Sequence, residues 1–172
     1  SSGEGLQGGS RSQAGPPPAP RKSAPSPWHG KFKGCTWNAN GLSHKPLADG
    51  RFKLGFLCSQ AHKYDFVVVT ETHLDNTDYR LSEEWLKRRG YECYWSHGTK
   101  HKGGILIGLN QKFLRNFDPK LTKATELWEG HLLQVDLYTS SKENFRITGC
   151  YLDAASLDDR LSQIAIIGSQ VE

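Results

Sequence analysis

The order of strand-like and helix-like segments predicts an α/β fold with a mixed sheet. Phe66–Val69 is a continuous apolar run rich in β-branched residues, typical of a strand that is covered on both faces. Arg51–Lys63 repeats apolar residues at helical spacing, which predicts an amphipathic helix. His131–Tyr138 and Phe145–Tyr151 predict an antiparallel hairpin, so the sheet is expected to contain both strand directions.

Each remaining element has its own local signal. Gly34–Trp37 follows a basic segment and ends in an Asn-rich turn, which predicts the first strand. Ser82–Arg89 has acidic residues first, basic residues last and a glycine after its end, which predicts a helix. Ser156, with Asp159 three residues later, predicts the N-cap of a last helix that ends near Val171. The other predicted elements are strands at Tyr91–Trp95 and Gly104–Leu109 and a hairpin turn at Thr139–Lys142.

Composition divides the chain into a tail and one domain. Residues 1–27 hold six of the eight prolines and contain no Val, Ile, Phe or Tyr. We expect this tail to be disordered, because it cannot bury enough apolar surface to offset its ordering entropy. Residues 28–172 are expected to form the domain. The net charge of +4 arises in residues 1–33, and the rest of the chain has 17 basic and 17 acidic residues, so charge alone does not indicate nucleic-acid binding.

The cysteines and the hydropathy pattern indicate the type of compartment. Cys35, Cys58, Cys93 and Cys150 show no metal-ligand spacing and are expected to be buried, reduced core residues, which favours an intracellular location. No apolar run is long enough to cross a bilayer, and the N-terminus lacks the apolar stretch of a secretory signal. The chain contains no Met, even at position 1, so we expect it not to be a complete translated reading frame but a processed product, a partial gene model or a fragment of a longer polyprotein.

Polar side chains that can bind ligands or take part in catalysis follow several of the predicted strands. Asn38 and Asn40 follow the first strand, and Glu71 follows the second. A carboxylate at a strand end is costly unless it is paired or binds a cation, and Mg²⁺ takes such a ligand together with waters and substrate oxygens. The Asn38 amide can donate to a phosphate oxygen or hold a catalytic carboxylate, and Tyr151, which ends a late strand, can offer its hydroxyl to a phosphate.

Taken singly, each of these residues has a structural alternative. Glu71 can cap a helix or pair with a lysine, Asn40 can serve only the turn, and Tyr151 can be a core or rim aromatic. His73 is expected to pack or meet solvent rather than bind metal, because no second His or Cys lies at ligand spacing.

In combination, the motifs resemble the endonuclease/exonuclease/phosphatase superfamily, and most of all the apurinic-type endonucleases of LINE-class (non-LTR) retrotransposons. The resemblance covers about residues 31–172 in family order. The motifs that carry it are Trp37–Leu42, Glu71–Leu74, Lys102–Ile107, Glu129–His131 and Phe145–Tyr151.

This resemblance implies a partial four-layer α/β sandwich, with mixed sheets and flanking helices, that comprises about two thirds of the family domain. It also implies Mg²⁺-dependent phosphodiester hydrolysis, with Mn²⁺ as an alternative metal. The substrate would be DNA, the location nuclear and the covalent partner a reverse transcriptase. Carried over by position, Glu71 binds the metal with Asn40 in the outer shell, Asn38 orients groups around the phosphate, and Tyr151 donates a hydrogen bond to the phosphate.

The sequence departs from the family pattern in two places. Ala154 stands where the family usually has an Asn, and the later Asp/Asn and Asp/His pairs have no counterpart, so the general base is missing. We therefore expect no DNA cleavage by these 172 residues. Two alternatives remain open: an inactive truncated copy, and a superfamily phosphatase or deadenylase. A half-sandwich is also expected to leave apolar residues of its sheet short of partners and the chain marginally stable. These residues are Val67, Val69, Ile105, Ile107 and Ile147.

Overall fold

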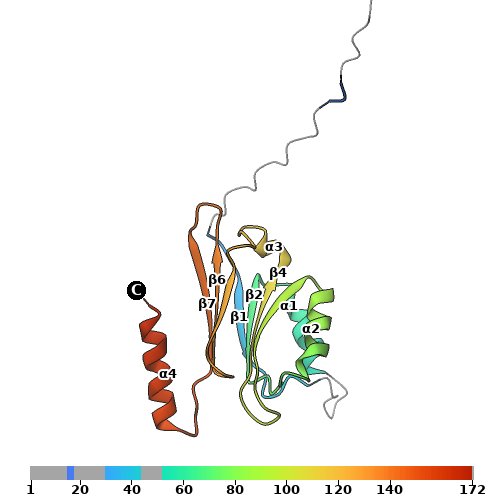
Figure 1. The fold of residues 1–172 in the computed structure, drawn as a ribbon. Helices are drawn as coiled ribbons and strands as arrows, with labels where there is room; N and C mark the ends of the chain where they lie inside the picture. Colours follow the sequence, from blue (N-terminus) through green and yellow to red (C-terminus); the bar gives the residue numbers. More distant parts are fainter. Residues whose placement is uncertain (1–14, 18–29, 44–51, 172) are drawn as a thin grey trace, which may run out of the picture.

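The computed structural model describes residues 15–17, 30–43 and 52–171, and they form two sheets with helices on the outer faces (Figure 1). The four-stranded sheet has the order β1-β2-β4-β3, in which β1 and β2 are parallel and the other neighbours are antiparallel. Its strands are β1 (Gly34–Asn38), β2 (Phe66–Thr70), β3 (Tyr91–Ser96) and β4 (Ile105–Asn110). The mixed α/β fold predicted from the sequence is thus confirmed.

The second sheet is a three-stranded antiparallel sheet with the order β5-β6-β7. Its strands are β5 (Lys123–Trp128), β6 (Leu132–Tyr138) and β7 (Asn144–Cys150). The turn between β6 and β7 is closed by hydrogen bonds from Thr139 N to Glu143 O and from Lys142 N to Thr139 O, as expected for the hairpin. The helices are α1 (Lys53–Ala61), α2 (Tyr79–Arg88), the short α3 (Gln111–Leu114) and α4 (Leu157–Ser169).

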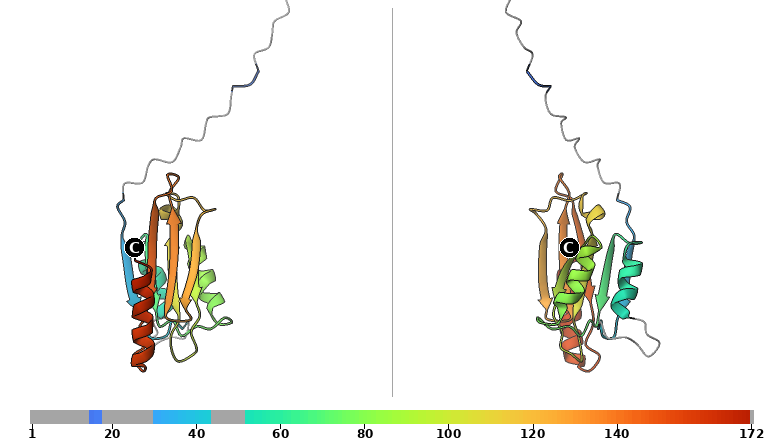
Figure 2. Two further views of the ribbon diagram at one scale, coloured as in Figure 1. Left: turned by 60° about the vertical axis from the view of Figure 1, so that its left-hand side comes forward. Right: turned by 90° about the vertical axis from the view of Figure 1, so that its right-hand side faces the viewer.

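These elements form four layers. Helices α1 and α2 cover one face of the four-stranded sheet, the three-stranded sheet covers the other face, and α4 lies on the far side of the three-stranded sheet (Figures 1 and 2). Helix α4 is attached there by polar contacts: Arg146 Nη1 of β7 donates to Gln170 O, and Gln163 Oε1 accepts from Asp153 N. The Ser156 hydroxyl accepts from Asp159 N, so the N-cap predicted for this last helix is confirmed.

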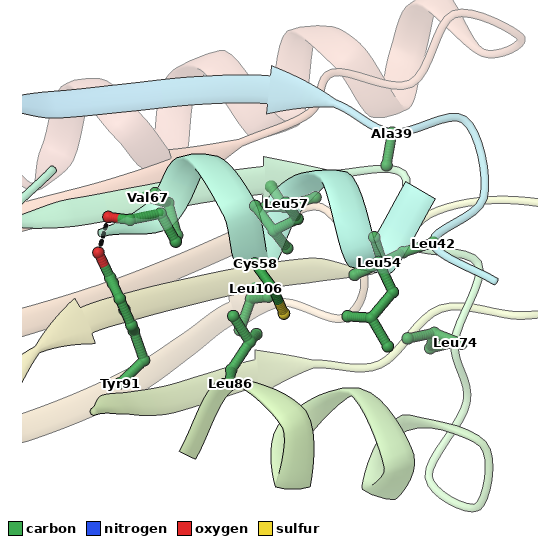
Figure 3. Packing of buried hydrophobic residues seen from close by; sticks show 12 residues of the cluster. Ala39, Leu42, Leu54, Leu57, Cys58, Val67, Leu74, Leu86, Tyr91 and Leu106 are labelled. Atoms are coloured by element: carbon green, nitrogen blue, oxygen red, sulfur yellow. Dashed lines mark hydrogen bonds between the residues drawn. The ribbon is translucent and has the colours of Figure 1, made fainter. Parts of the chain in front are cut away.

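The first of two apolar cores lies between the helices and the four-stranded sheet. Leu54, Leu57 and Cys58 on one face of α1 pack toward Leu86 of α2 and Leu106 of β4 (Figure 3). The apolar residues that recur at helical spacing in this segment thus form the face of α1 that is buried against the sheet, which stabilises the helix.

The second core lies between the two sheets and overturns one sequence-based expectation. Val135 and Leu137 of β6 and Ile147 of β7 pack against Ile105 and Ile107 of β4. The apolar residues expected to lack partners are therefore buried, with at most 5% of each exposed, since β5–β7 already supply the facing sheet and α1 and α2 cover the opposite face. The residues corrected here are Val67, Val69, Ile105, Ile107 and Ile147.

The prediction that all four cysteines are buried is wrong. Cys58 is buried and Cys35 and Cys93 are half-buried, but Cys150 is exposed. It lies at the end of β7, which is an edge strand, and its side chain faces away from the core between the sheets. All four thiols are free.

Two elements were not anticipated, and some predictions cannot be compared with the structure. Strand β5 carries no apolar run, and helix α3 is only four residues long, although Asn110 caps it by accepting from Lys112 N. The disordered tail predicted for residues 1–27 and the helix start at Arg51 fall outside the described residues, except that 15–17 form neither helix nor strand. None of the helices described is long and apolar enough to cross a membrane.

Candidate active site

The ends of β1 and β2 place two of the predicted site residues at one edge of the four-stranded sheet. The strands are parallel, and Asn38 pairs in register with Thr70, so Glu71 begins the loop directly beside Asn38. In open α/β sheets, ligands bind outside the carboxyl ends of strands. The structure thus brings Asn38 and Glu71 together, as their positions after successive strands predicted.

Main-chain hydrogen bonds join the two loops that carry these residues. Ala39 N donates to Thr70 O at 2.9 Å, and Gly41 N donates to Glu71 O at 2.8 Å. Leu42 N donates to Thr72 O at 2.8 Å. These three hydrogen bonds therefore keep the Asn-rich loop beside the Glu71 loop as far as Leu42 and Thr72.

The same pattern continues toward the second sheet. Thr72 N donates to Gly104 O at 3.1 Å, and Gly104 N donates to Gly130 O at 2.9 Å. Tyr151 N donates to His131 O at 2.8 Å. Five segments from both sheets thus form one continuous rim, here defined as residues 38–42, 70–74, 103–104, 130–131 and 151.

Backbone conformations at this rim are unusual. Glu71 has φ 51°, His73 has φ 53° and Asn40 has φ 43°, all in the left-handed region. Gly104, with φ 94°, lies so close to the neighbouring loop that a Cβ there would overlap the Thr72 hydroxyl. Non-glycine residues adopt this region at a cost and tend to do so at functional sites, which agrees with a role for Glu71.

Glu71 and Tyr151 meet across the rim. The Tyr151 hydroxyl donates a hydrogen bond to the Glu71 carboxylate, and this bond, with partial burial and the nearby negative charge, raises the pKa of Tyr151 to about 12. Both side chains are partly exposed. Tyr151 therefore remains a protonated donor throughout the physiological range, held against the one carboxylate that the sequence singled out.

Asn38 and Asn40 form the turn that follows β1. Asn38 Oδ1 accepts from Asn40 N at 3.0 Å, so the amide oxygen serves the turn, and Nδ2 is the donor that the side chain can offer to a ligand. In the described structure, Asn40 makes its hydrogen bonds through its main-chain N and O atoms. Both residues are exposed. The turn alternative for Asn40 is therefore correct as a structural role, and its predicted place in a metal's outer shell stays a prediction.

Lys53 is a residue that sequence reasoning missed. Its Nζ donates to Ala39 O at 2.7 Å and to Asn40 O at 2.8 Å, which fixes the turn from the first residue of α1. Nothing in the sequence identifies this lysine, because it lies 13 positions after Asn40 and at the start of an ordinary amphipathic helix.

Two cavities flank the rim. One, of about 360 Å³, lies beside Tyr151 and is lined by Lys102, Trp128, His131 and Asp153, among others. The other, of about 500 Å³, lies beside the Asn-rich turn and is lined by Gly41, His73, Lys100 and His101, among others. The short loop between β3 and β4 therefore carries exposed cationic side chains to both sides of the candidate site.

The residues at the rim fit a weakly held Mg²⁺ rather than a fully protein-ligated metal. Within residues 15–17, 30–43 and 52–171, no group of three or more His, Cys, Asp or Glu side chains could hold an ion. Mg²⁺ keeps several waters and is often bound through one or two carboxylates plus substrate phosphate oxygens, so the single Glu71 carboxylate at an exposed edge suits it. His73 is half-buried and lines the second cavity, and the expectation that it does not bind metal stays a prediction.

Solved structures with a similar fold include nucleases and a phosphatase. No protein-family model and no curated protein sequence matches the chain. An AP endonuclease from Archaeoglobus fulgidus aligns with a TM-score of 0.53 and 17% identity over 80% of this chain and 49% of that chain. ANGEL2, a 2′,3′-cyclic phosphatase solved in complex with adenosine-2′,3′-vanadate, aligns with a TM-score of 0.57 and 15% identity over 81% of this chain and 47% of that chain.

A third structure names the superfamily itself. The endonuclease/exonuclease/phosphatase from Beutenbergia cavernae aligns with a TM-score of 0.50 and 14% identity over 82% of this chain and 44% of that chain. The chain therefore shares its α/β fold with these solved structures and spans about half of their length. At this level of identity the likeness describes the fold alone.

Proposed function

We propose that the rim is the metal- and phosphate-binding part of a Mg²⁺-dependent phosphodiesterase, and that its substrate is DNA cut by an endonuclease of retroelement type. The observation that carries the proposal is the continuous main-chain hydrogen bonding of the rim, which brings Asn38, Glu71 and Tyr151 to one edge and leaves Tyr151 near enough to Glu71 to raise its pKa. The nuclease and phosphatase names of structures with this fold support the same class of reaction.

Each side chain has a defined task in this proposal. Glu71 holds the Mg²⁺ ion, and Asn40 lies in its outer shell. A bound Mg²⁺ supplies a positive charge that stabilises the phosphoryl oxygens and the leaving group. Asn38 donates from Nδ2 to a phosphate oxygen. Tyr151, neutral at physiological pH, donates its O–H to another phosphate oxygen when substrate is bound. Such donors stabilise charge that develops during hydrolysis.

Metal binding tests the proposal most directly, since it does not require a general base. Mn²⁺ added to isotopically labelled protein should broaden the NMR signals of Glu71 and its neighbours along the rim. The Glu71→Gln variant should lose this broadening, whereas Glu84→Gln, on the exposed face of α2, should retain it. Equal broadening in both variants, or none in the wild type, would remove Glu71 as the metal ligand.

A cleavage assay separates the alternative functions. Because the Asp/His pair of the resembled family has no counterpart here, we expect the 172 residues to bind Mn²⁺ without nicking supercoiled plasmid. Mg²⁺-dependent nicking that is lost in Glu71→Gln would overturn that expectation. Hydrolysis of a 2′,3′-cyclic nucleotide or of poly(A), with no effect on plasmid, would replace DNA by the substrate of a phosphatase or deadenylase.

A further inference from the structure

We propose that His131 positions Tyr151 for the candidate active site by donating a hydrogen bond from Nδ1 to the Tyr151 carbonyl oxygen. The inference deepens the proposed function, because it identifies what holds the phosphate-binding hydroxyl toward Glu71. It rests on contacts between two residues that flank the ends of β6 and β7 and on the low exposure of His131.

His131 and Tyr151 face each other at the rim end of β6 and β7. Leu132 pairs with Cys150 in the strand register, and the two residues just outside that pair are His131 and Tyr151. Tyr151 N donates to His131 O at 2.8 Å. In the reverse direction, His131 Nδ1 lies 2.8 Å from Tyr151 O. The two residues are therefore joined in both directions, once through the main chain and once through the imidazole.

The second contact fixes the tautomer of His131. A carbonyl oxygen only accepts hydrogen bonds, so Nδ1 must carry the proton and Nε2 has the lone pair in the neutral ring. The side chain is only 8% exposed, which leaves the ring little room to turn. The donor is thus held in place rather than shared with solvent.

The imidazole also supports the face of the phenol ring. The two rings are stacked, with centroids 5.7 Å apart and an angle of 18° between their planes. The Tyr151 hydroxyl at the far end of that ring donates to Glu71. Tyr151 is consequently held at its carbonyl and ring face by His131 and at its hydroxyl by the candidate metal ligand.

A matched pair of variants isolates the Nδ1 donor. Asn at position 131 places an amide N–H near the site of Nδ1, whereas the longer Gln places its amide near the site of Nε2. Both variants lose the ring, so any difference between them reports the hydrogen bond to the Tyr151 carbonyl. Thermal unfolding of each variant shows whether it is folded under the conditions of the measurement.

The readout is the contact of the Tyr151 hydroxyl with Glu71, followed by ¹⁹F NMR of 3-fluorotyrosine at position 151. In the wild type and in His131→Asn, changing Glu71 to Gln should shift the fluorine resonance. In folded His131→Gln, the same change at Glu71 should leave the resonance in place. The fluorine label at Tyr94, whose hydroxyl donates to Glu92, serves as the control and should not respond to either residue.

Equal responses in His131→Asn and His131→Gln would overturn the proposal, whether both are retained or both are lost. The measurement requires neither metal nor DNA. If Mn²⁺ fails to bind at Glu71 while the fluorine response follows the expected pattern, the proposed function fails and the positioning role of His131 stands.

Discussion

Lys53 Nζ lies 2.8 Å from the carbonyl oxygen of Asn40, although 13 positions separate the two residues in the sequence. A second hydrogen bond, 2.7 Å long, joins the same ammonium group to the carbonyl oxygen of Ala39. The first residue of α1 therefore holds the turn that presents Asn38 at the edge of the sheet.

Replacing Lys53 by Met should loosen this turn. Hydrogen bonds to charged groups contribute on the order of 2 kcal/mol when they are shielded from solvent, and one of the two Lys53 bonds is exposed, so we expect the free energy of unfolding in urea to fall by about 2 kcal/mol in total. Lys63→Met is the control, because Lys63 Nζ donates to the exposed Gln60 side chain near the other end of the helix. That variant should change stability by less than about 0.5 kcal/mol. Equal losses in the two variants would mean that the turn does not depend on Lys53.

Tyr151 should make the stability of the protein depend on alkaline pH. Its folded-state pKa of about 12 lies above the ordinary value of 10, because the hydroxyl donates to Glu71. A raised pKa stabilises the folded state fully below pH 10, and this contribution disappears as pH rises through about 12. The wild type should therefore exceed Tyr151→Phe in stability near pH 8 and lose that advantage between pH 10 and 12. Other titrating tyrosines and cysteines are common to both proteins, so a constant difference across this range would contradict the Tyr151–Glu71 bond.

Ile107→Ala tests whether the two sheets pack in solution as described. Ile107 is fully buried between the sheets, and truncating such a residue typically costs about 3 kcal/mol. Leu161→Ala removes the same kind of side chain from the outer face of α4, where it is 55% exposed, and should change stability by less than about 0.5 kcal/mol. Urea unfolding of the two variants gives both numbers, and a small effect at Ile107 would restore the idea of an uncovered sheet face.

Arg146→Met should expose the cost of burying Asp136. Asp136 is 4% exposed and accepts from Arg146 Nε at 2.7 Å. Removing the cation leaves a buried carboxylate without its ionic partner, which we expect to cost about 2 kcal/mol because Arg146 itself is partly exposed. In the double variant Asp136→Asn/Arg146→Met, much of that loss should be recovered. If the double variant is no better than the single one, the pair is not what stabilises this face of the second sheet.

Lys102→Ala should reduce the salt dependence of DNA binding if the rim contacts a phosphate backbone. Each phosphate contact contributes a slope of about 0.9 in a plot of log affinity against log salt. The slope measured by fluorescence anisotropy should therefore fall by about that amount in Lys102→Ala. Lys63→Ala, near the start of β2 and thus at the opposite end of the strand from Glu71, should leave it unchanged. An unaltered slope in both would place DNA away from this cavity.

Secondary structure could be predicted from the sequence where a single local signal determines the element. The apolar β-branched run of β2 and the Ser156 cap of α4 are signals of this kind, and both are confirmed. Strand β5 was missed because Lys123–Trp128 mixes charged and helix-favouring residues and lies at a sheet edge, where pairing with β6 rather than composition makes it a strand.

In the candidate site, too, some residues could be placed from the sequence and others could not. Asn38 and Glu71 could be placed at one edge, since parallel strands deliver the residues that follow them to the same place. The roles of Lys53 and His131 could not be predicted, because each depends on a hydrogen bond between segments that meet only after folding. The burial of the sheet faces was also mispredicted, because β5–β7 form a complete facing layer within this length of chain.

The rim is held together mainly by main-chain hydrogen bonds, which every residue type except proline can both donate and accept. Changes of side chain at Asn38 or Glu71 can therefore alter the chemistry of the edge while its outline persists. A variant with other side chains at these positions is therefore expected to keep its fold and its thermal unfolding while its chemistry changes.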